Sequence, residues 1–225
     1  MKFTRARLLA IGVALLLASS TLFALTLPRG GPSNNVGSSI RVACVGDSIT
    51  DGSGYVNDLS TLLGVNYTVG NFGVGGACVS QGSKKPYANL PQFEGVKGFL
   101  PDIVVIMLGT NDAPETPTGS IVNFTRDYKM LITGFQASAS RPEIWLVKLP
   151  PIFNNTEGFS SQFLVQEVIP RIEQVANQTG LPLIDVYTPL ASHPEYFPDG
   201  VHPYGEGARI IATEVFNAIT ANITG

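Results

Sequence analysis

The 225-residue sequence has few charged residues and no stretch in which charges of one sign collect. Charged residues make up only 14% of the chain, and the formal net charge is −3. Without a basic patch, the chain lacks the electrostatic footprint of a nucleic-acid-binding protein. A hydrophobic content of 44% is too high for a disordered chain. Internal repeats and heptad patterns are absent as well, which excludes solenoids and coiled coils.

Cysteine and histidine are scarce, with two residues of each. The spacing of Cys44 and Cys78 is not that of metal ligands, so the sequence predicts no metal site. We expect the two cysteines near neighbouring strands, and two interpretations stay open. They form a disulfide, which suits an exported protein, or they are two buried free thiols.

The N-terminal segment, residues 1–27, has the pattern of a secretory signal peptide or an N-terminal membrane anchor. Three basic residues precede residues 8–27, which carry no charge and are long enough to span a bilayer. In both cases the basic residues stay inside and the rest of the chain is exported. We therefore expect a secreted or extracytoplasmic protein, tethered to the membrane if this segment is not cleaved.

The remainder of the chain divides into a linker and one domain. Residues 28–39 are rich in Pro, Gly and Asn and predict a linker without a fold of its own. Residues 40–225 are a suitable length for one domain with one core. Five N-x-[ST] sequons predict a glycoprotein if the source cell has the machinery. Their acceptor residues are Asn66, Asn123, Asn154, Asn177 and Asn222.

Apolar segments and helical patterns alternate along this domain. The segments expected to form strands are 40–45, 67–69, 103–108, 143–149 and 183–186. The segments expected to form helices are 55–63, 90–99, 121–135, 163–176 with a kink at Pro170, and 204–220. This alternation predicts an α/β fold, a three-layer α/β/α sandwich around a five-stranded parallel sheet.

Small and polar residues follow three of the predicted strands at their carboxyl ends, where ligands bind in open α/β sheets. Ser48 follows the first strand, the glycine-rich segment 71–76 the second, and Asn111 the third. Each also has a purely structural interpretation, as a helix cap or a turn residue. In the functional interpretation, Ser48 is a nucleophile, and its N–H, a glycine N–H and the Asn111 side chain stabilise an oxyanion.

A serine nucleophile needs a base, and the sequence has only two histidines to offer an imidazole. His202 lies on a short loop before the last predicted helix, with Asp199 three residues earlier. A carboxylate in that position can hold the ring's tautomer and stabilise the imidazolium. His193, beside Pro194 and Glu195, is typical of a surface histidine. We therefore expect His202 to be the base.

The segments that carry these residues resemble the four signature blocks of the SGNH/GDSL hydrolases, a flavodoxin-like family. The blocks are GDS at 46–48, NFGVGG at 71–76, GTND at 109–112 and DGVHP at 199–203. They occur in the family's order, and the resemblance covers about residues 40–219. It implies a carboxylic ester hydrolase with Ser48 as nucleophile, His202 as base and Asp199 as the partner of His202.

The resemblance also implies which groups form the oxyanion hole. These are the Ser48 N–H, the Gly76 N–H and the Asn111 side chain, with Gly73 as the alternative glycine. Ile49 replaces the family's leucine, which is a volume-conserving difference. The family chemistry needs no cofactor and no metal.

Within the family, the sequence is most similar to bacterial carbohydrate O-acetyl esterases of the sialate or xylan acetylesterase type. The similar segments are 85–87, 91–93, 150–153 and 197–200. This similarity implies hydrolysis of acetyl esters on a small-molecule or polysaccharide substrate, through an acyl-enzyme intermediate. Two alternatives stay open. The first is a lysophospholipase, short-chain lipase or thioesterase, and the second is a non-catalytic glycan-binding protein on this scaffold.

Overall fold

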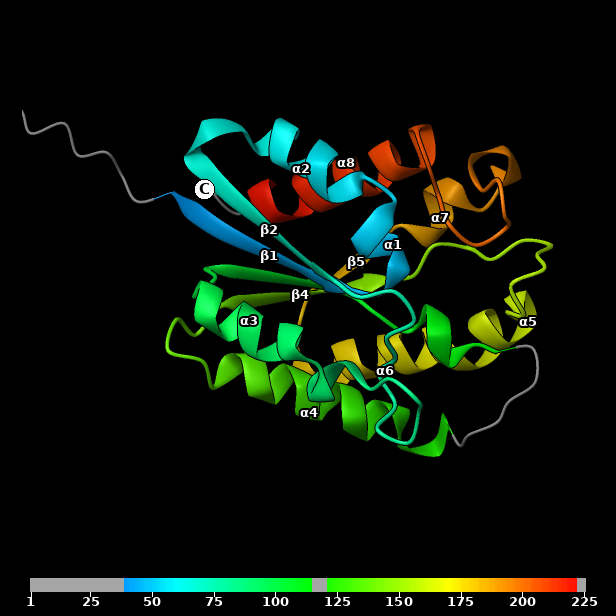
Figure 1. Ribbon diagram of the computed structural model, residues 1–225, viewed down its shortest axis with the longest axis horizontal. Coiled ribbons are helices and arrows are strands. Elements are labelled where there is room, and N and C mark those ends of the chain that lie inside the picture. The colour runs from blue at the N-terminus through cyan, green and yellow to red at the C-terminus, as the bar shows by residue number, and fades with distance from the viewer. Residues whose placement is uncertain (1–38, 115–120, 222–225) are drawn as a thin grey trace, which may run out of the picture. The chain divides into compact units, whose positions relative to one another are not determined.

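A five-stranded sheet lies between two layers of helices in the computed structural model, which describes residues 39–114 and 121–221 (Figure 1). This domain corresponds to residues 37–225 of the chain. The predicted signal peptide or anchor at 1–27 and the linker up to residue 38 lie outside the described residues. No helix within the described ranges is long and apolar enough to cross a membrane.

All strand pairs in the sheet are parallel, and the strand order is β2-β1-β3-β4-β5. The strands are β1 (Ile40–Gly46), β2 (Tyr67–Gly73), β3 (Ile103–Met107), β4 (Glu143–Lys148) and β5 (Leu183–Asp185). All five residues of β3 are buried, because a parallel sheet is covered on both faces. The predicted fold class, an α/β sandwich around five parallel strands, is confirmed.

One strand is longer than its sequence predicts. The glycines after residue 69 indicate a turn, yet β2 continues to Gly73 and pairs with β1 along its whole length. Backbone pairing with β1 extends the strand to Gly73, because hydrogen bonds between strands need no apolar side chains at the edge of a sheet.

The helices cover the sheet in two groups. On one face lie α1 (Ser48–Gly52), α2 (Tyr55–Leu63), α7 (Tyr187–Leu190) and α8 (Glu206–Ala221) (Figure 1). On the other lie α3 (Pro91–Phe99), α4 (Phe124–Gln136), α5 (Ser161–Phe163) and α6 (Ile169–Thr179) (Figure 1). The buried stripe of α4 contains Phe124, Tyr128, Leu131, Ile132 and Phe135, as its 3.6-residue pattern predicts.

The helical segment around Pro170 differs from its prediction. A π-helical turn at Leu164–Val168, which the sequence does not predict, leads directly into α6, and Pro170 is the second residue of α6. A π-helical turn departs from the regular hydrogen-bond pattern of an α-helix, which suits a following proline because it has no N–H to donate and its ring crowds the carbonyl four residues earlier. The helix then ends at Gly180, whose φ of 68° is left-handed.

The cysteines are two buried free thiols, which decides between the two interpretations left open by the sequence. Cys44 is fully buried in β1, and Cys78 lies in the loop after β2.

Four of the sequon asparagines are exposed, at positions 66, 123, 154 and 177, and Asn222 lies outside the described residues. Glycosylation stays a prediction.

Gly46 at the end of β1 provides a test of how closely the chain packs at this point. A Cβ atom there would collide with the Thr50 side chain and lie 2.5 Å from the Met107 carbonyl oxygen. Gly46→Ala should therefore lower the free energy of unfolding by about 2–3 kcal/mol, measured by denaturant titration.

Gly98→Ala is the matched control, because a Cβ atom at this position in α3 would have no neighbour within 4 Å. Its stability should stay unchanged or rise by up to about 1 kcal/mol. Equal denaturation midpoints for Gly46→Ala and the wild type would contradict the close packing.

Candidate active site

The strand order places the candidate residues at one edge of the sheet. The chain moves from β1 outward to β2 and then returns across β1 to β3, so the direction of winding reverses between β1 and β3. In open α/β sheets, ligands bind in the crevice outside the carboxyl ends of the strands at such a switch point. Ser48 directly follows β1, and Asn111 lies in a 3₁₀ turn just beyond β3.

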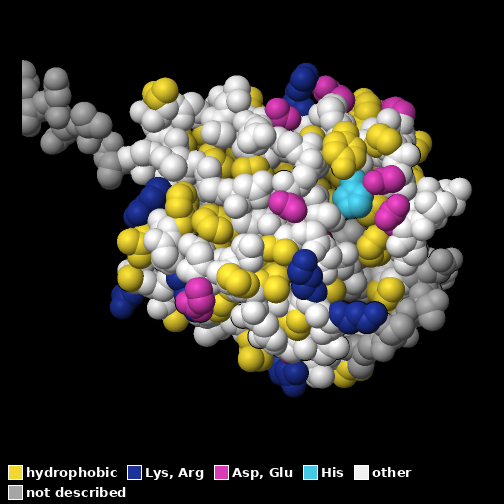
Figure 2. All heavy atoms as spheres, viewed as in Figure 1, with side chains coloured by type: hydrophobic (Ala, Val, Ile, Leu, Met, Phe, Trp, Pro, Cys, Tyr) yellow, Lys and Arg dark blue, Asp and Glu magenta, His cyan; other side chains and the backbone are white. Residues whose placement is uncertain are grey.

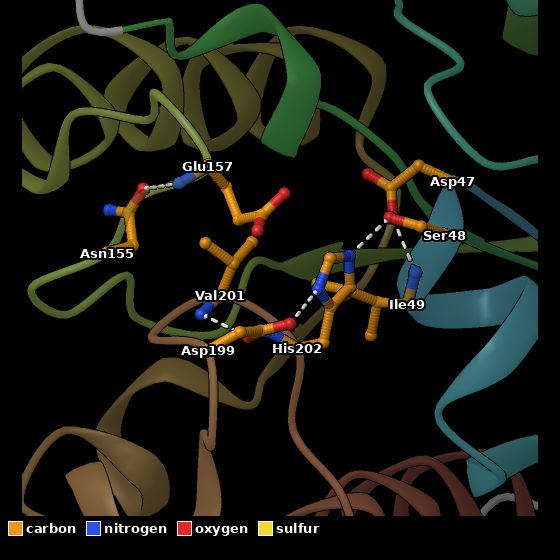
Figure 3. A network of polar contacts seen from close by, with 8 residues as sticks. All are labelled: Asp47, Ser48, Ile49, Asn155, Glu157, Asp199, Val201 and His202. Carbon is orange, nitrogen blue, oxygen red and sulfur yellow. Dashed lines mark hydrogen bonds and ion pairs between the residues drawn. The ribbon is translucent and has the colours of Figure 1, made fainter.

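Asp47, and not Ser48, caps the helix that follows β1. The Asp47 Oδ1 atom accepts a hydrogen bond of 3.0 Å from the Ile49 N–H, which satisfies one of the free donors of α1. The structural interpretation of Ser48 as a helix cap is therefore wrong. Its hydroxyl instead faces His202 (Figure 3).

Ser48, His202 and Asp199 form a continuous chain of hydrogen bonds (Figure 3). Ser48 Oγ lies 2.8 Å from His202 Nε2, and His202 Nδ1 lies 2.6 Å from Asp199 Oδ2. In this arrangement the imidazole can accept the hydroxyl proton while the carboxylate stabilises the imidazolium that forms. The geometry brings together all three residues that the sequence predicts for proton transfer.

The loop that carries Asp199 holds its carboxylate firmly. Asp199 Oδ1 accepts hydrogen bonds from the Val201 N–H at 2.9 Å and from the His202 N–H at 2.7 Å. Partial burial raises the pKa of Asp199, but these two N–H groups and the His202 ring outweigh that effect and lower it below its ordinary value. Asp199 therefore stays anionic beside the imidazole.

Gly200 allows this loop to turn tightly. Its φ of +81° is left-handed, and a Cβ atom there would collide with the Asn154 carbonyl oxygen. The Gly200 carbonyl accepts a 2.7 Å hydrogen bond from the Phe153 N–H, which ties the loop to the segment after β4. Residues 152–155 and 159–161 of that segment line an open pocket of about 410 Å³.

The structure distinguishes the two glycines considered for the oxyanion hole. The Gly73 N–H donates to Asn71 Oδ1 at 2.9 Å, so it is already engaged. The Gly76 N–H has no acceptor among the described residues. The adjoining Gly75 lies beside the nucleophile, because a Cβ atom there would be 3.9 Å from Ser48 Cβ. These contacts favour Gly76 over Gly73.

Asn111 lies against the same loop. Its Nδ2 atom donates to the Ala77 carbonyl at 3.0 Å, which uses one of the two amide hydrogens and fixes the orientation of the side chain. The second amide hydrogen is left for a ligand, since an amide nitrogen has two donors. Asn111 thus connects the end of β3 to the glycine-rich loop.

Asp112, which the sequence did not single out, holds the loop after β2 through its carboxylate. Its carboxylate accepts hydrogen bonds from the Val79 N–H at 2.8 Å and the Ser80 N–H at 3.0 Å. Burial raises its pKa, and these N–H groups offset part of that rise. The available signal was its position directly after Asn111 in the block GTND.

The second histidine belongs to a different surface. His193 Nδ1 pairs with Glu195 Oε1 at 2.8 Å, and its ring stacks on Tyr196 with centroids 4.8 Å apart. It makes no contact with Ser48, as the sequence predicts. On the face drawn in Figure 2, which labels no residues, one of the two histidine side chains is exposed next to acidic side chains. Over the two described ranges, no cluster of three metal-ligating side chains occurs.

The match to a known family agrees with this fold and geometry. The model of the GDSL-like lipase/acylhydrolase family matches residues 44–210, so the chain belongs to this family. An acetylxylan esterase of Xylanibacter ruminicola is 31% identical over 206 residues, which cover 80% of this chain and 43% of that protein. The chain therefore spans less than half the length of this relative.

Two solved structures illustrate the likeness in fold. A GDSL-like lipase from Bacteroides thetaiotaomicron has 26% sequence identity and a TM-score of 0.63, over 81% of this chain and 88% of that chain. A carbohydrate acetylesterase from Sinorhizobium meliloti has 17% identity and a TM-score of 0.63, over 82% of this chain and all of that chain. At 17% identity the second structure supports the fold alone.

The buried Asp47 carboxyl makes a specific contribution to the pH dependence of stability. Burial raises its pKa to about 6, although the Ile49 N–H partly offsets the rise. A carboxyl whose pKa is higher in the folded state than in the unfolded state loses stability as the pH rises between the two values. At 1.36 kcal/mol per pKa unit, this loss amounts to about 3 kcal/mol between about pH 4 and pH 6.

Asp47→Asn should remove this loss, because asparagine keeps an oxygen for the Ile49 N–H and does not ionise. Unfolding free energies of both proteins, measured across this pH range, give the comparison. The wild type should lose about 3 kcal/mol more than the variant. Parallel curves would show that the carboxyl is not destabilised by burial.

Proposed function

We propose that the protein is a serine esterase that hydrolyses short-chain esters, chiefly acetyl esters on carbohydrates. The observation that carries the proposal is the hydrogen-bonded chain from Ser48 Oγ through His202 to Asp199. Family membership supports ester hydrolysis, and the related acetylxylan esterase supports an acetylated carbohydrate as the substrate class. The substrate is a small-molecule or polysaccharide ester.

The proposed reaction begins when His202 takes the hydroxyl proton and Ser48 Oγ attacks the ester carbonyl carbon. The carbonyl oxygen becomes an oxyanion, which accepts hydrogen bonds from the Ser48 N–H, the Gly76 N–H and the Asn111 side chain. The tetrahedral intermediate then collapses, and the imidazolium gives its proton to the leaving alcohol. An acyl-enzyme ester at Ser48 remains.

The second half of the reaction repeats these roles with water. His202 takes a proton from water, the resulting hydroxide attacks the acyl-enzyme carbonyl, and the same donors stabilise the second oxyanion. Collapse of this intermediate releases the carboxylic acid and returns the proton from His202 to Ser48 Oγ. Asp199 stays anionic throughout and stabilises the imidazolium in both halves.

Hydrolysis of p-nitrophenyl acetate, butyrate and octanoate by the full chain tests this proposal. The rate should decrease with the length of the acyl chain, and Ser48→Ala should show no activity above background. Circular dichroism and the thermal midpoint of the variant should match those of the wild type, which excludes loss by unfolding.

The other outcomes favour the alternatives. A rate that rises with acyl length would favour a lysophospholipase or short-chain lipase. Absence of hydrolysis with a folded wild type would favour a glycan-binding protein on this scaffold. Activity that persists in Ser48→Ala would assign the nucleophile to another residue.

Asn111→Ala tests the oxyanion hole separately from the nucleophile. Removal of one preorganised donor should lower kcat by about 10²–10³-fold with little change in KM, because the interaction forms only in the transition state. Steady-state kinetics with p-nitrophenyl acetate measure this change. A loss of less than tenfold in kcat would remove Asn111 from the oxyanion hole.

A further inference from the structure

The orientation of one peptide bond decides whether Gly76 can serve as an oxyanion donor. The carbonyl of Gly75 and the N–H of Gly76 belong to the same peptide unit. None of the peptide bonds is cis in the described part of the chain, so these two groups point in opposite directions. The direction of the Gly75 carbonyl therefore sets the direction of the Gly76 N–H.

This peptide is the central one of a β-turn. The Ala77 N–H donates to the Val74 carbonyl at 3.0 Å, with Gly75 and Gly76 in the two central positions. Gly76 has a φ of +77° and the φ of Gly75 is not positive, which defines a type II turn. A type I turn with the same ends differs mainly by a flip of the central peptide.

The sequence of the turn does not select between the two forms. Glycine adopts positive and negative φ about equally well, so Gly75 and Gly76 fit both types. In a type I turn, the Gly75 carbonyl oxygen would take the place of the Gly76 N–H and repel an oxyanion. A contact outside the turn must therefore favour the productive orientation.

Lys85 supplies such a contact. Its ammonium group donates a 2.7 Å hydrogen bond to the Gly75 carbonyl oxygen. Hydrogen bonds with a charged donor are stronger than neutral ones. Lys85 belongs to none of the ion pairs between described residues, so no carboxylate there competes for its ammonium group.

The backbone of Lys85 is anchored to the same loop. Its carbonyl accepts a 2.9 Å hydrogen bond from the Cys78 N–H, and the Tyr87 N–H donates to the Cys78 carbonyl at 2.9 Å. Tyr87 is fully buried, and its hydroxyl donates to the Phe72 carbonyl at 2.6 Å. These contacts hold the start of the lysine side chain within reach of Gly75.

We propose that Lys85 is a positioning residue of the oxyanion hole, which holds the Gly75–Gly76 peptide in the orientation that presents the Gly76 N–H beside Ser48. Its charge also polarises this peptide and makes the N–H a stronger donor. The inference rests on the proposed esterase function, and it assigns Lys85 no contact with the substrate. Lys85 acts only through the peptide.

The test compares Lys85→Met, Lys85→Arg and Lys84→Met in the full chain, with p-nitrophenyl acetate as substrate. Methionine removes the charge and the donor at similar length, whereas arginine keeps both. Lys84 is the matched control, because it is exposed and makes no hydrogen bond or ion pair within the described part of the chain. Thermal midpoints of all variants check that the fold is intact.

Lys85→Met should lower kcat by about 10–100-fold with KM within about twofold, less than the loss of a whole donor. Affinity for phenylboronic acid, which forms a tetrahedral adduct on a nucleophilic serine, should fall by a similar factor. Lys85→Arg should restore kcat to within about threefold, and Lys84→Met should match the wild type.

Two results would overturn the inference without affecting the proposed function. One is a Lys85→Met enzyme with wild-type kcat and boronate affinity, while Ser48→Ala is inactive. The other is a rise in KM at unchanged kcat, which indicates a role in substrate binding. Absence of hydrolysis in the wild type itself would overturn the proposed function and this inference together.

Discussion

The 2.8 Å hydrogen bond between Ser48 and His202 joins residues that lie 154 positions apart, and the candidate site depends on it. Both residues lie at the carboxyl edge of the sheet, where Ser48 begins α1 directly after β1 and His202 lies on the loop before α8. The parallel sheet brings these loops together, because all of its strands end at the same edge. Close packing at Gly46 and the tight turn at Gly200 support this arrangement, since neither glycine leaves room for a side chain.

The glycine-rich loop shows how side chains position a backbone that has little preference of its own. Asn71 engages the Gly73 N–H, Asn111 the Ala77 carbonyl and Lys85 the Gly75 carbonyl. The buried Asp112 accepts from two further N–H groups of the same loop. After these contacts, the Gly76 N–H is left without an acceptor among the described residues. A glycine-rich segment thus presents a preorganised donor.

Local sequence patterns predict most of the fold, and the differences have identifiable causes. Each predicted strand is present, because five buried apolar segments separated by helical patterns have few other solutions. The sequence underestimates β2, whose last residues pair through the backbone alone, and misses α1 with its Asp47 cap. It also misses the π-helical turn before Pro170.

The sequence by itself determined the identity of the candidate groups, Ser48, Asp199, His202, Gly76 and Asn111, because residue type and motif order carry that information. The tertiary structure alone decided which of them meet and how each is held. The Gly73 N–H is bonded to the Asn71 side chain, and Cys44 and Cys78 remain free thiols. The pKa of Asp47 is raised, while the pKa of Asp199 is lowered. These properties depend on burial and on partners distant in the chain, which local sequence does not encode.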